Sequence, residues 1–247
     1  MIGIIWRVCL VGLVALLAAV LTLPLSVATD RLKGAAPGIQ WTQVQGTVWS
    51  GRISNVSFGR QMIGDVKLRL KPMSLLSGSL SYDVDLMGPV AAGTATVFGN
   101  SSTFGVSQGE ITARVEQMIG LNASVRQAGG IIRFRDMNLE MTRGLDCETA
   151  SGRIWTEVLV NVGAEYGEDL PELDGEVSCE AGMLDVGLNG ESASAVRVDI
   201  DARVGLREAS RLDARIGGVS GELGQALSAL GFTVSDGDFV YARELSQ

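Results

Sequence analysis

The chain has 247 residues, of which 20 are Lys or Arg and 28 are Asp or Glu, giving a formal net charge of −8, and it contains no His. The excess of negative charge speaks against nucleic-acid binding, because neutralising phosphates takes clustered Lys and Arg. The lack of histidine excludes His-based triads, His metal sites and His proton shuttles. Glycine, at 32 of 247 residues, is about twice as frequent as usual, which favours turns and closely approaching strands over helical bundles.

A long apolar segment near the N-terminus predicts insertion into a membrane. The uninterrupted stretch begins at Val8 and the segment continues to Leu23. As a helix, together with the apolar residues before it, this segment reaches the thickness of a bilayer. Trp6 suits an interfacial position and Arg7 a charged flank. The anchor residues are therefore predicted to be Trp6, Arg7, Val8 and Leu23.

The fate of this segment has two interpretations. Ser26-Val27-Ala28 resembles a signal peptidase site, so that cleavage after Ala28 is one alternative. The length of the apolar segment and the hydrophobic residues before Arg7 favour retention. We expect residues 1–28 to be a transmembrane signal anchor with a short N-terminus, and residues 29–247 to be a single translocated domain.

Three cysteines bear on the compartment of the domain. Cys9 lies in the apolar segment, where a free thiol behaves as a small hydrophobe. Cys147 and Cys179 form an even pair in the rest of the chain. In a translocated domain such a pair predicts one disulfide, worth about 3 to 4 kcal/mol on the chain-entropy estimate. Two unrelated buried thiols are the alternative.

The body of the chain alternates apolar and polar residues in the manner of half-buried strands. The clearest stretches are 66–71, 80–86 and 196–204. Weaker strands are predicted at 41–49, 52–58, 90–98, 131–141, 153–162, 176–179, 184–188, 212–216 and 239–243. The links between them are short and rich in Gly, Asn and Ser, which suits antiparallel hairpins.

Charges on two of these strands predict their pairing. Lys67, Arg69 and Lys71 are followed one hairpin later by Asp83 and Asp85. Pairing the two strands places opposite charges across from one another on the wet face. The link between them, 72–78, is expected to form one helical turn that starts at a proline and stops at a glycine.

Helices are expected to be scarce, at 115–119 and 221–230 only. The fold class is therefore mainly β: an N-terminal transmembrane helix, then a curved, mostly antiparallel sheet, folded over or grooved, with one or two short helices. Two short helices cannot cover the apolar face of so large a sheet. That face must be buried by the sheet itself, by lipid or by a partner protein.

The most distinctive short string is Gly46-Thr47-Val48-Trp49-Ser50-Gly51. It is typical of a hairpin in which a tryptophan packs over glycines. Ser50 has no base near it in sequence, and no catalytic motif occurs elsewhere. The acidic stretch 165–176 does not match a calcium loop. We therefore predict no enzyme activity, no catalytic residue, no cofactor and no metal.

Several ordered features together resemble the type II secretion system protein N family. They are an N-terminal anchor, the residues Gly46, Thr47, Val48, Trp49 and Gly51 about 20 positions after it, Pro72–Leu80, and a cysteine pair. The second half is similar as well, through Cys147 followed by Gly152 and Trp155, and through Leu173–Cys179 followed by Gly182.

This resemblance implies an accessory subunit of the type II secretion system with a β-rich domain. It implies a single-pass protein of the cell inner membrane whose C-terminal domain lies in the periplasm. Its partners would be other type II secretion components and the inner membrane, with no nucleic acid. Part of the pattern is also similar to AsmA-like envelope proteins, so that a lipid-handling groove with lipid on the apolar face is the alternative.

Overall fold

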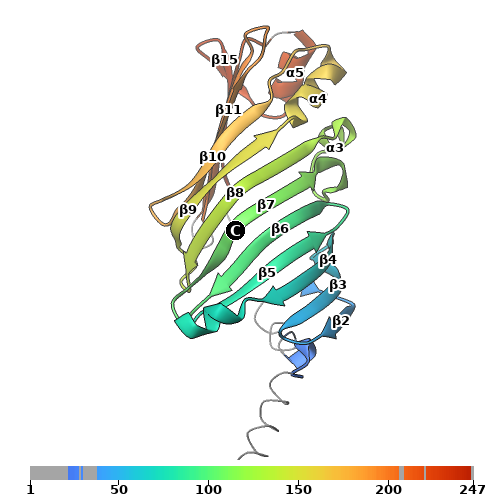
Figure 1. Cartoon of the computed structure of the whole chain (residues 1–247). Helices are drawn as coiled ribbons and strands as arrows, with labels where there is room; N and C mark the ends of the chain where they lie inside the picture. The colour runs from blue at the N-terminus through green and yellow to red at the C-terminus, as the bar shows by residue number, and fades with distance from the viewer. Residues whose placement is uncertain (1–21, 28, 30–37, 206–208, 220, 246–247) are drawn as a thin grey trace, which may run out of the picture.

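A computed structural model describes residues 22–27, 29, 38–205, 209–219 and 221–245. The chain forms one open sheet of 15 strands, and every pair of neighbouring strands is antiparallel. The strands lie in the sheet in the order of the chain, except that β1 and β2 both pair with β3 at one edge, and β15 lies between β13 and β14 at the other. Figure 1 shows the strands running from blue at the N-terminal edge to red at the C-terminal edge. The expected antiparallel, mainly β architecture is confirmed.

The strands vary from two to twelve residues. They are β1 (Ile39–Gln40), β2 (Gln43–Gly46), β3 (Ser50–Phe58), β4 (Gln61–Leu70), β5 (Leu80–Met87), β6 (Ala91–Gly99), β7 (Thr103–Arg114), β8 (Ile131–Thr142), β9 (Cys147–Thr156), β10 (Leu173–Glu180), β11 (Met183–Glu191), β12 (Arg197–Val204), β13 (Ser210–Gly217), β14 (Thr233–Ser235) and β15 (Asp238–Leu245).

Nearly all helical connections lie at one end of the strands. They are η2 (Val115–Gln117), α3 (Ala123–Ala128), α4 (Val158–Tyr166) and α5 (Gly221–Ala229). Figure 1 shows α3, α4 and α5 grouped at this end, which we call the helix end. The opposite end carries tight turns and the 3-10 turn η1 (Pro72–Ser77), and we call it the turn end. Helices therefore exceed the one or two that we expected.

The predicted strand at 153–162 is wrong in its second half. Strand β9 ends at Thr156, and helix α4 starts at Val158. The hydroxyl of Thr156 accepts a hydrogen bond from the Val158 N–H at 3.2 Å, and Leu159 and Tyr166 pack against the buried core. Burial of these two side chains outweighs the strand preference of the valines in this segment.

Strand β7 was not predicted because a bulge hides its alternation. Val106 pairs with Leu139 and Ile111 pairs with Phe134, with register shifts between these pairs. Gln108 adopts a φ of 53° there. The extra residue reverses which positions point to the apolar face, so the apolar residues no longer recur with a period of two.

The main buried core lies at the helix end of the C-terminal strands. Leu173 and Val198 from the sheet pack with Leu223 and Leu227 of α5, and Leu173 is only 2% exposed. Among the described residues, this core cluster has no member from β3–β9. One corner of the apolar face is therefore covered by α4 and α5.

Candidate interaction surfaces

The sheet separates apolar from polar side chains into two faces. Residues directly opposite each other in neighbouring strands share a face. An unbroken row of such partners runs from β3 to β15 and consists of apolar residues and glycines: Ile53, Val66, Leu86, Gly93, Ile111, Phe134, Ile154, Gly175, Leu188, Ile200, Ala214 and Tyr241. This row defines the apolar face.

The apolar face is open toward the turn end. Its exposed members there are Leu80 at 52%, Val97 at 41%, Phe104 at 40% and Val204 at 41%. Each of them lies in the half of its strand that is farther from the helices. We call these four residues the open strip. The helices thus leave apolar surface uncovered, as the sequence led us to expect.

The string 46–51 holds the N-terminal segment against the sheet. It forms the hairpin between β2 and β3, with Gly46 paired to Gly51. The Val48 N–H donates to the Leu23 carbonyl at 3.0 Å, and Pro24 forms a β-bridge with Thr47. The hairpin is therefore a contact through which residues 23–25 join the domain.

Gly51 is the tightest point of this contact. A Cβ at Gly51 would lie 2.5 Å from Leu25 Cδ2 and 2.7 Å from the Gln45 carbonyl oxygen. Leu25 is 3% exposed, so its side chain fills the space above the glycine. The Trp49 carbonyl accepts a hydrogen bond from the Leu70 N–H at 2.9 Å, which links the hairpin to the end of β4.

The predicted anchor falls mostly outside the described residues. Trp6, Arg7 and Val8 lie there, whereas Leu23 is described and is 42% exposed. In the part of the chain that the structure describes, no helix is long and apolar enough to cross a membrane. The anchor and the division at residue 28 remain predictions.

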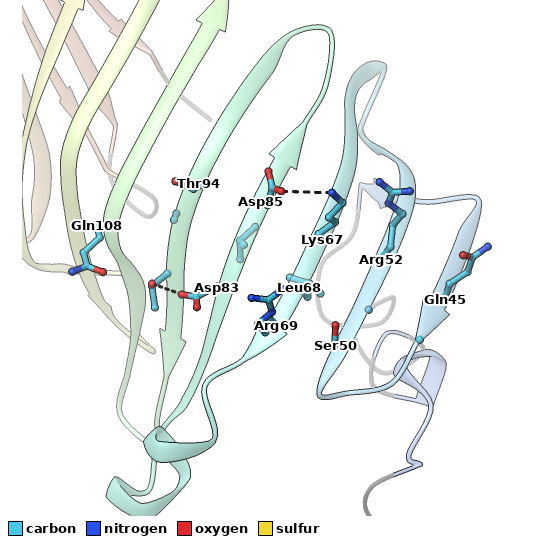
Figure 2. Close-up of a pocket in the computed structure, with 15 residues that line it drawn as sticks. Gln45, Ser50, Arg52, Lys67, Leu68, Arg69, Asp83, Asp85, Thr94 and Gln108 are labelled. Atoms are coloured by element: carbon cyan, nitrogen blue, oxygen red, sulfur yellow. Dashed lines mark hydrogen bonds and ion pairs between the residues drawn. The ribbon is translucent and has the colours of Figure 1, made fainter.

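The reverse face of the sheet is polar and carries paired charges. Lys67 lies opposite Asp85 and Arg69 opposite Asp83, which confirms the predicted strand pairing. Lys67 Nζ is 3.8 Å from Asp85, and Lys71 Nζ is 2.8 Å from Asp83. Lys67, Arg69, Asp83 and Asp85 line a depression of about 760 Å³ between β3 and β7, and Figure 2 shows their side chains.

Asp83 is both ion-paired and hydrogen-bonded in this depression. It accepts hydrogen bonds from Lys71 and, at 2.9 Å, from the Thr96 hydroxyl. The hydrogen bond from Lys71, followed by that from Thr96, lowers the pKa of Asp83 below its ordinary value despite some desolvation. A carboxylate that is paired and hydrogen-bonded in this way organises the polar face and is not poised to take up a proton.

The charges of this face are arranged in pairs on neighbouring strands. Across the described ranges, no group of three or more Cys, Asp or Glu residues is placed to hold a metal ion. Near the C-terminal strands, Arg203 bridges Glu180 at 2.8 Å and Asp185 at 3.1 Å. Surface pairs of this kind contribute little stability singly and mark a solvated face.

The two cysteines of the domain form the disulfide Cys147–Cys179. It joins the start of β9 to the end of β10 at the turn end. The Cys147 N–H also donates to the Gly182 carbonyl at 2.7 Å, and Gly182 has a φ of 82° in the turn that follows. These residues of the second-half resemblance thus fix the turn end of the sheet.

Trp155, also part of that resemblance, lies on the polar face. Its indole N–H donates to Glu172 at 2.9 Å, and the Arg133 guanidinium lies 5.0 Å from the ring centroid. Arg133 is the strand partner of Trp155. A cation over an indole ring and a hydrogen-bonded indole N–H both stabilise the pairing of β8, β9 and the loop before β10.

The two edges of the sheet differ. At the N-terminal edge, β2 pairs with residues 51–54 of β3 and β1 with residues 57–58, so that short strands cover it. At the C-terminal edge, β14 covers only residues 238–240 of β15. Within the described residues, the outer side of 241–245 pairs with no strand. Such an edge is open to β-augmentation.

These features define an open-sheet protein with a long apolar face, a charge-paired polar face and one open edge. A profile of type II secretion system protein N matches residues 37–241. The chain belongs to the type II secretion system protein N family, and its role lies in type II secretion. It matches no curated protein and no solved structure.

Sequence reasoning found the hairpin string but missed what it contacts. The string alone predicts a hairpin with a core tryptophan, whereas the structure makes it an attachment point of residues 23–25. The signal in the sequence is Gly51, a glycine near the start of a strand, just after the turn. A glycine inside a strand marks a place where another part of the chain approaches closely.

Proposed function

We propose that this protein is an accessory subunit of the type II secretion system that acts by docking to other secretion components in the periplasm. The N-terminal segment attaches it to the inner membrane, and the sheet provides the contact surface. The role is non-catalytic. Membership of the secretion family supports the setting, and the open strip supports the mode of action.

The open strip is the observation that carries the docking role. Val97 and Phe104 are large apolar side chains that stand in ordered strands and remain about 40% exposed. They belong to neighbouring strands, so their surface is continuous. Contiguous apolar surface on a rigid sheet is typical of a protein interface, because burying it in a complex removes it from water.

The argument for the lipid-handling alternative is weaker. An acyl chain needs a trough with apolar walls on several sides, and the helices cover the apolar face at one end while leaving apolar side chains exposed at the other. The depression in Figure 2 lies on the opposite, charged face. The open strip therefore favours a protein partner.

Site-specific photocrosslinking tests this proposal. A photoreactive phenylalanine derivative is placed at Val97 of the full chain, in cells that assemble the secretion system. The matched control is Thr94, three positions away on the same strand, exposed on the polar face and lining the depression. We expect a secretion component, identified by mass spectrometry, to be crosslinked from position 97 and at least several-fold less from position 94.

Two results would contradict the proposal. Equal crosslinking from positions 97 and 94 would mean that the open strip is not the docking surface. A lipid adduct at position 97, with no protein adduct, would replace docking by the lipid-handling alternative.

A further inference from the structure

The 3-10 turn η1 presents three exposed apolar side chains, two of which are largely exposed and one of which is partly covered. Met73 is 74% exposed, Leu76 is 83% exposed and Leu75 is 42% exposed. The turn has no buried residue. We call Met73, Leu75 and Leu76 the apolar tip. Exposed residues of this size on one short turn need a function, because they cost solubility and add nothing to the core.

The turn is rigid, and its polar groups satisfy one another. The Ser74 hydroxyl donates to the Lys71 carbonyl at 2.7 Å, and the Ser77 hydroxyl donates to the Ser74 carbonyl at 2.8 Å. Gly78 closes the turn in the left-handed conformation. Because these hydroxyls already have acceptors, the turn loses few hydrogen bonds with water when it is desolvated.

The base of the turn is fixed to the polar face. Lys71 precedes η1, and its ammonium contacts Asp83 and the Thr96 hydroxyl, both at 2.8 Å. The residues of the turn itself, 72–79, carry no charge. The neighbouring turn at 100–102 is also uncharged. An apolar tip without charges has the composition of a segment that enters a membrane interface.

The apolar tip lies at the same edge of the sheet as the residues that connect the domain to its N-terminal segment. The Leu23 carbonyl accepts a hydrogen bond from the Val48 N–H, and the Trp49 carbonyl accepts one from the Leu70 N–H. The turn η1 begins two residues after Leu70. Figure 1 shows the blue N-terminal segment and the teal turn between β4 and β5 at the same lower edge of the sheet. The apolar stretch that starts at Val8 therefore joins the domain at the same edge of the sheet as the tip.

We infer that the apolar tip is a membrane-contact site, at which Met73, Leu75 and Leu76 enter the interfacial layer of a lipid bilayer. The inference rests on the proposed attachment of the N-terminal segment to that bilayer. The segment brings the domain to the lipid surface, and the tip sets its orientation there by a second contact.

Fluorescence quenching in vesicles tests the inference. The full chain with Cys9→Ser is reconstituted into phosphatidylcholine vesicles that carry a spin-labelled lipid near the headgroup. A polarity-sensitive fluorophore is attached at Leu76→Cys. The matched control is Ile119→Cys, an apolar residue that is 56% exposed at the opposite, helix end of the strands. We expect a blue shift and quenching at position 76 and neither at position 119.

A variant of the tip measures the contribution of one side chain. Met73→Ser, with the fluorophore at position 76, removes an exposed side chain and leaves the fold unchanged. Burying a large apolar side chain is worth roughly tenfold or more in an equilibrium constant. We expect the ratio of quenched to unquenched fluorophore to fall by about tenfold if burial of Met73 is complete, and by less if it is partial.

The outcomes separate the two proposals. If the chain resists carbonate extraction from the vesicles while the fluorophore at position 76 stays as unquenched as that at 119, the membrane contact is wrong and the attachment stands. If the chain is extracted completely, the proposed attachment fails. A blue shift at 76 without quenching by spin-labelled lipid would indicate burial against a second copy, and would overturn the inference.

Discussion

A methyl group added at Gly51 should detach the N-terminal segment from the sheet. In Gly51→Ala, the new Cβ would lie 2.5 Å from Leu25 Cδ2, 2.7 Å from the Gln45 carbonyl oxygen and 3.3 Å from the Thr47 carbonyl oxygen. The two carbonyls belong to the backbone of the hairpin, whereas Leu25 Cδ2 is the end of a side chain, so Leu25 is the neighbour that gives way more easily. Leu25 must then leave its place.

The free-energy cost of Gly51→Ala follows from this crowding. Overpacking of this kind costs about 1–3 kcal/mol, which corresponds to a roughly 5- to 150-fold change in the equilibrium between docked and released segment. Removing the displaced side chain instead, in Leu25→Ala, costs about 2–5 kcal/mol for a buried leucine. In the double variant the two effects should fall short of their sum, because the smaller residue leaves room for the methyl group.

Amide hydrogen exchange of the full chain measures the release at a single bond. The Val48 N–H donates to the Leu23 carbonyl, so its exchange should accelerate by the same 5- to 150-fold factor. The Leu70 N–H, bonded to Trp49, reports on the hairpin's link to β4, and should change less.

Gly99→Ala is the matched control, since a Cβ there meets nothing closer than 3.7 Å. Unchanged exchange at Val48 in Gly51→Ala would refute the argument that close approach explains this glycine. Equal acceleration at Val48 and Leu70 would mean that the whole hairpin opens, and that the glycine serves the hairpin itself.

Three further predictions concern stability. Replacing both Cys147 and Cys179 by serine should lower the free energy of unfolding by about 3 to 4 kcal/mol, because the disulfide closes a loop with a sequence separation of 32; urea unfolding with and without a reductant checks this, and an equal response of wild type and variant to the reductant would contradict it. Leu173→Ala, at a site 2% exposed, should cost about 2–5 kcal/mol, whereas Val97→Ala, at a site 41% exposed, should cost much less; similar urea midpoints would show that the open strip is covered. The pKa of Asp83 is lowered in the fold from 3.8, so its hydrogen bonds stabilise the protein above that pH and stop doing so as the pH falls through the folded value. Because its side chain is 51% exposed, the loss should stay below about 1 kcal/mol, and Asp83→Asn should be less sensitive to acid than wild type between neutral pH and about pH 3.

The strand pairing was predictable where charge and alternation agree. Lys67 and Arg69 meet Asp85 and Asp83 in register because strands joined by one short connection pair with each other, and each charge needs a partner on the wet face. The 3-10 turn at 72–77 was predictable for a similar reason, since proline starts it and glycine ends it.

Bulges and tertiary packing explain what the sequence did not reveal. Gln108 and Asp136 adopt positive φ values where the register between β7, β8 and β9 shifts, and each extra residue moves the following side chains to the other face. Helix α4 contains three valines and a tyrosine, which favour strands, among its nine residues, and its packing against the core outweighs that preference. The open strip had no signal of its own, because exposure depends on where the helices lie.

The two proposals together constrain how the protein stands on a membrane. From β3 to β15 the sheet makes eleven steps between neighbouring strands, which at about 4.8 Å each give a path of roughly 50 Å. Residues 23–25 and the apolar tip lie near the ends of β3 and β4, at the beginning of this path, whereas the open strip extends from Leu80 in β5 to Val204 in β12. Two contacts with the bilayer at one end prevent the sheet from lying flat, so the strip leads away from the lipid, with Leu80 nearest to it and Val204 farthest from it. A docked partner should therefore crosslink to Val97 through a part of its chain that lies near the membrane, and to Val204 through a part that lies farther out. The same part of the partner at both positions would contradict this orientation.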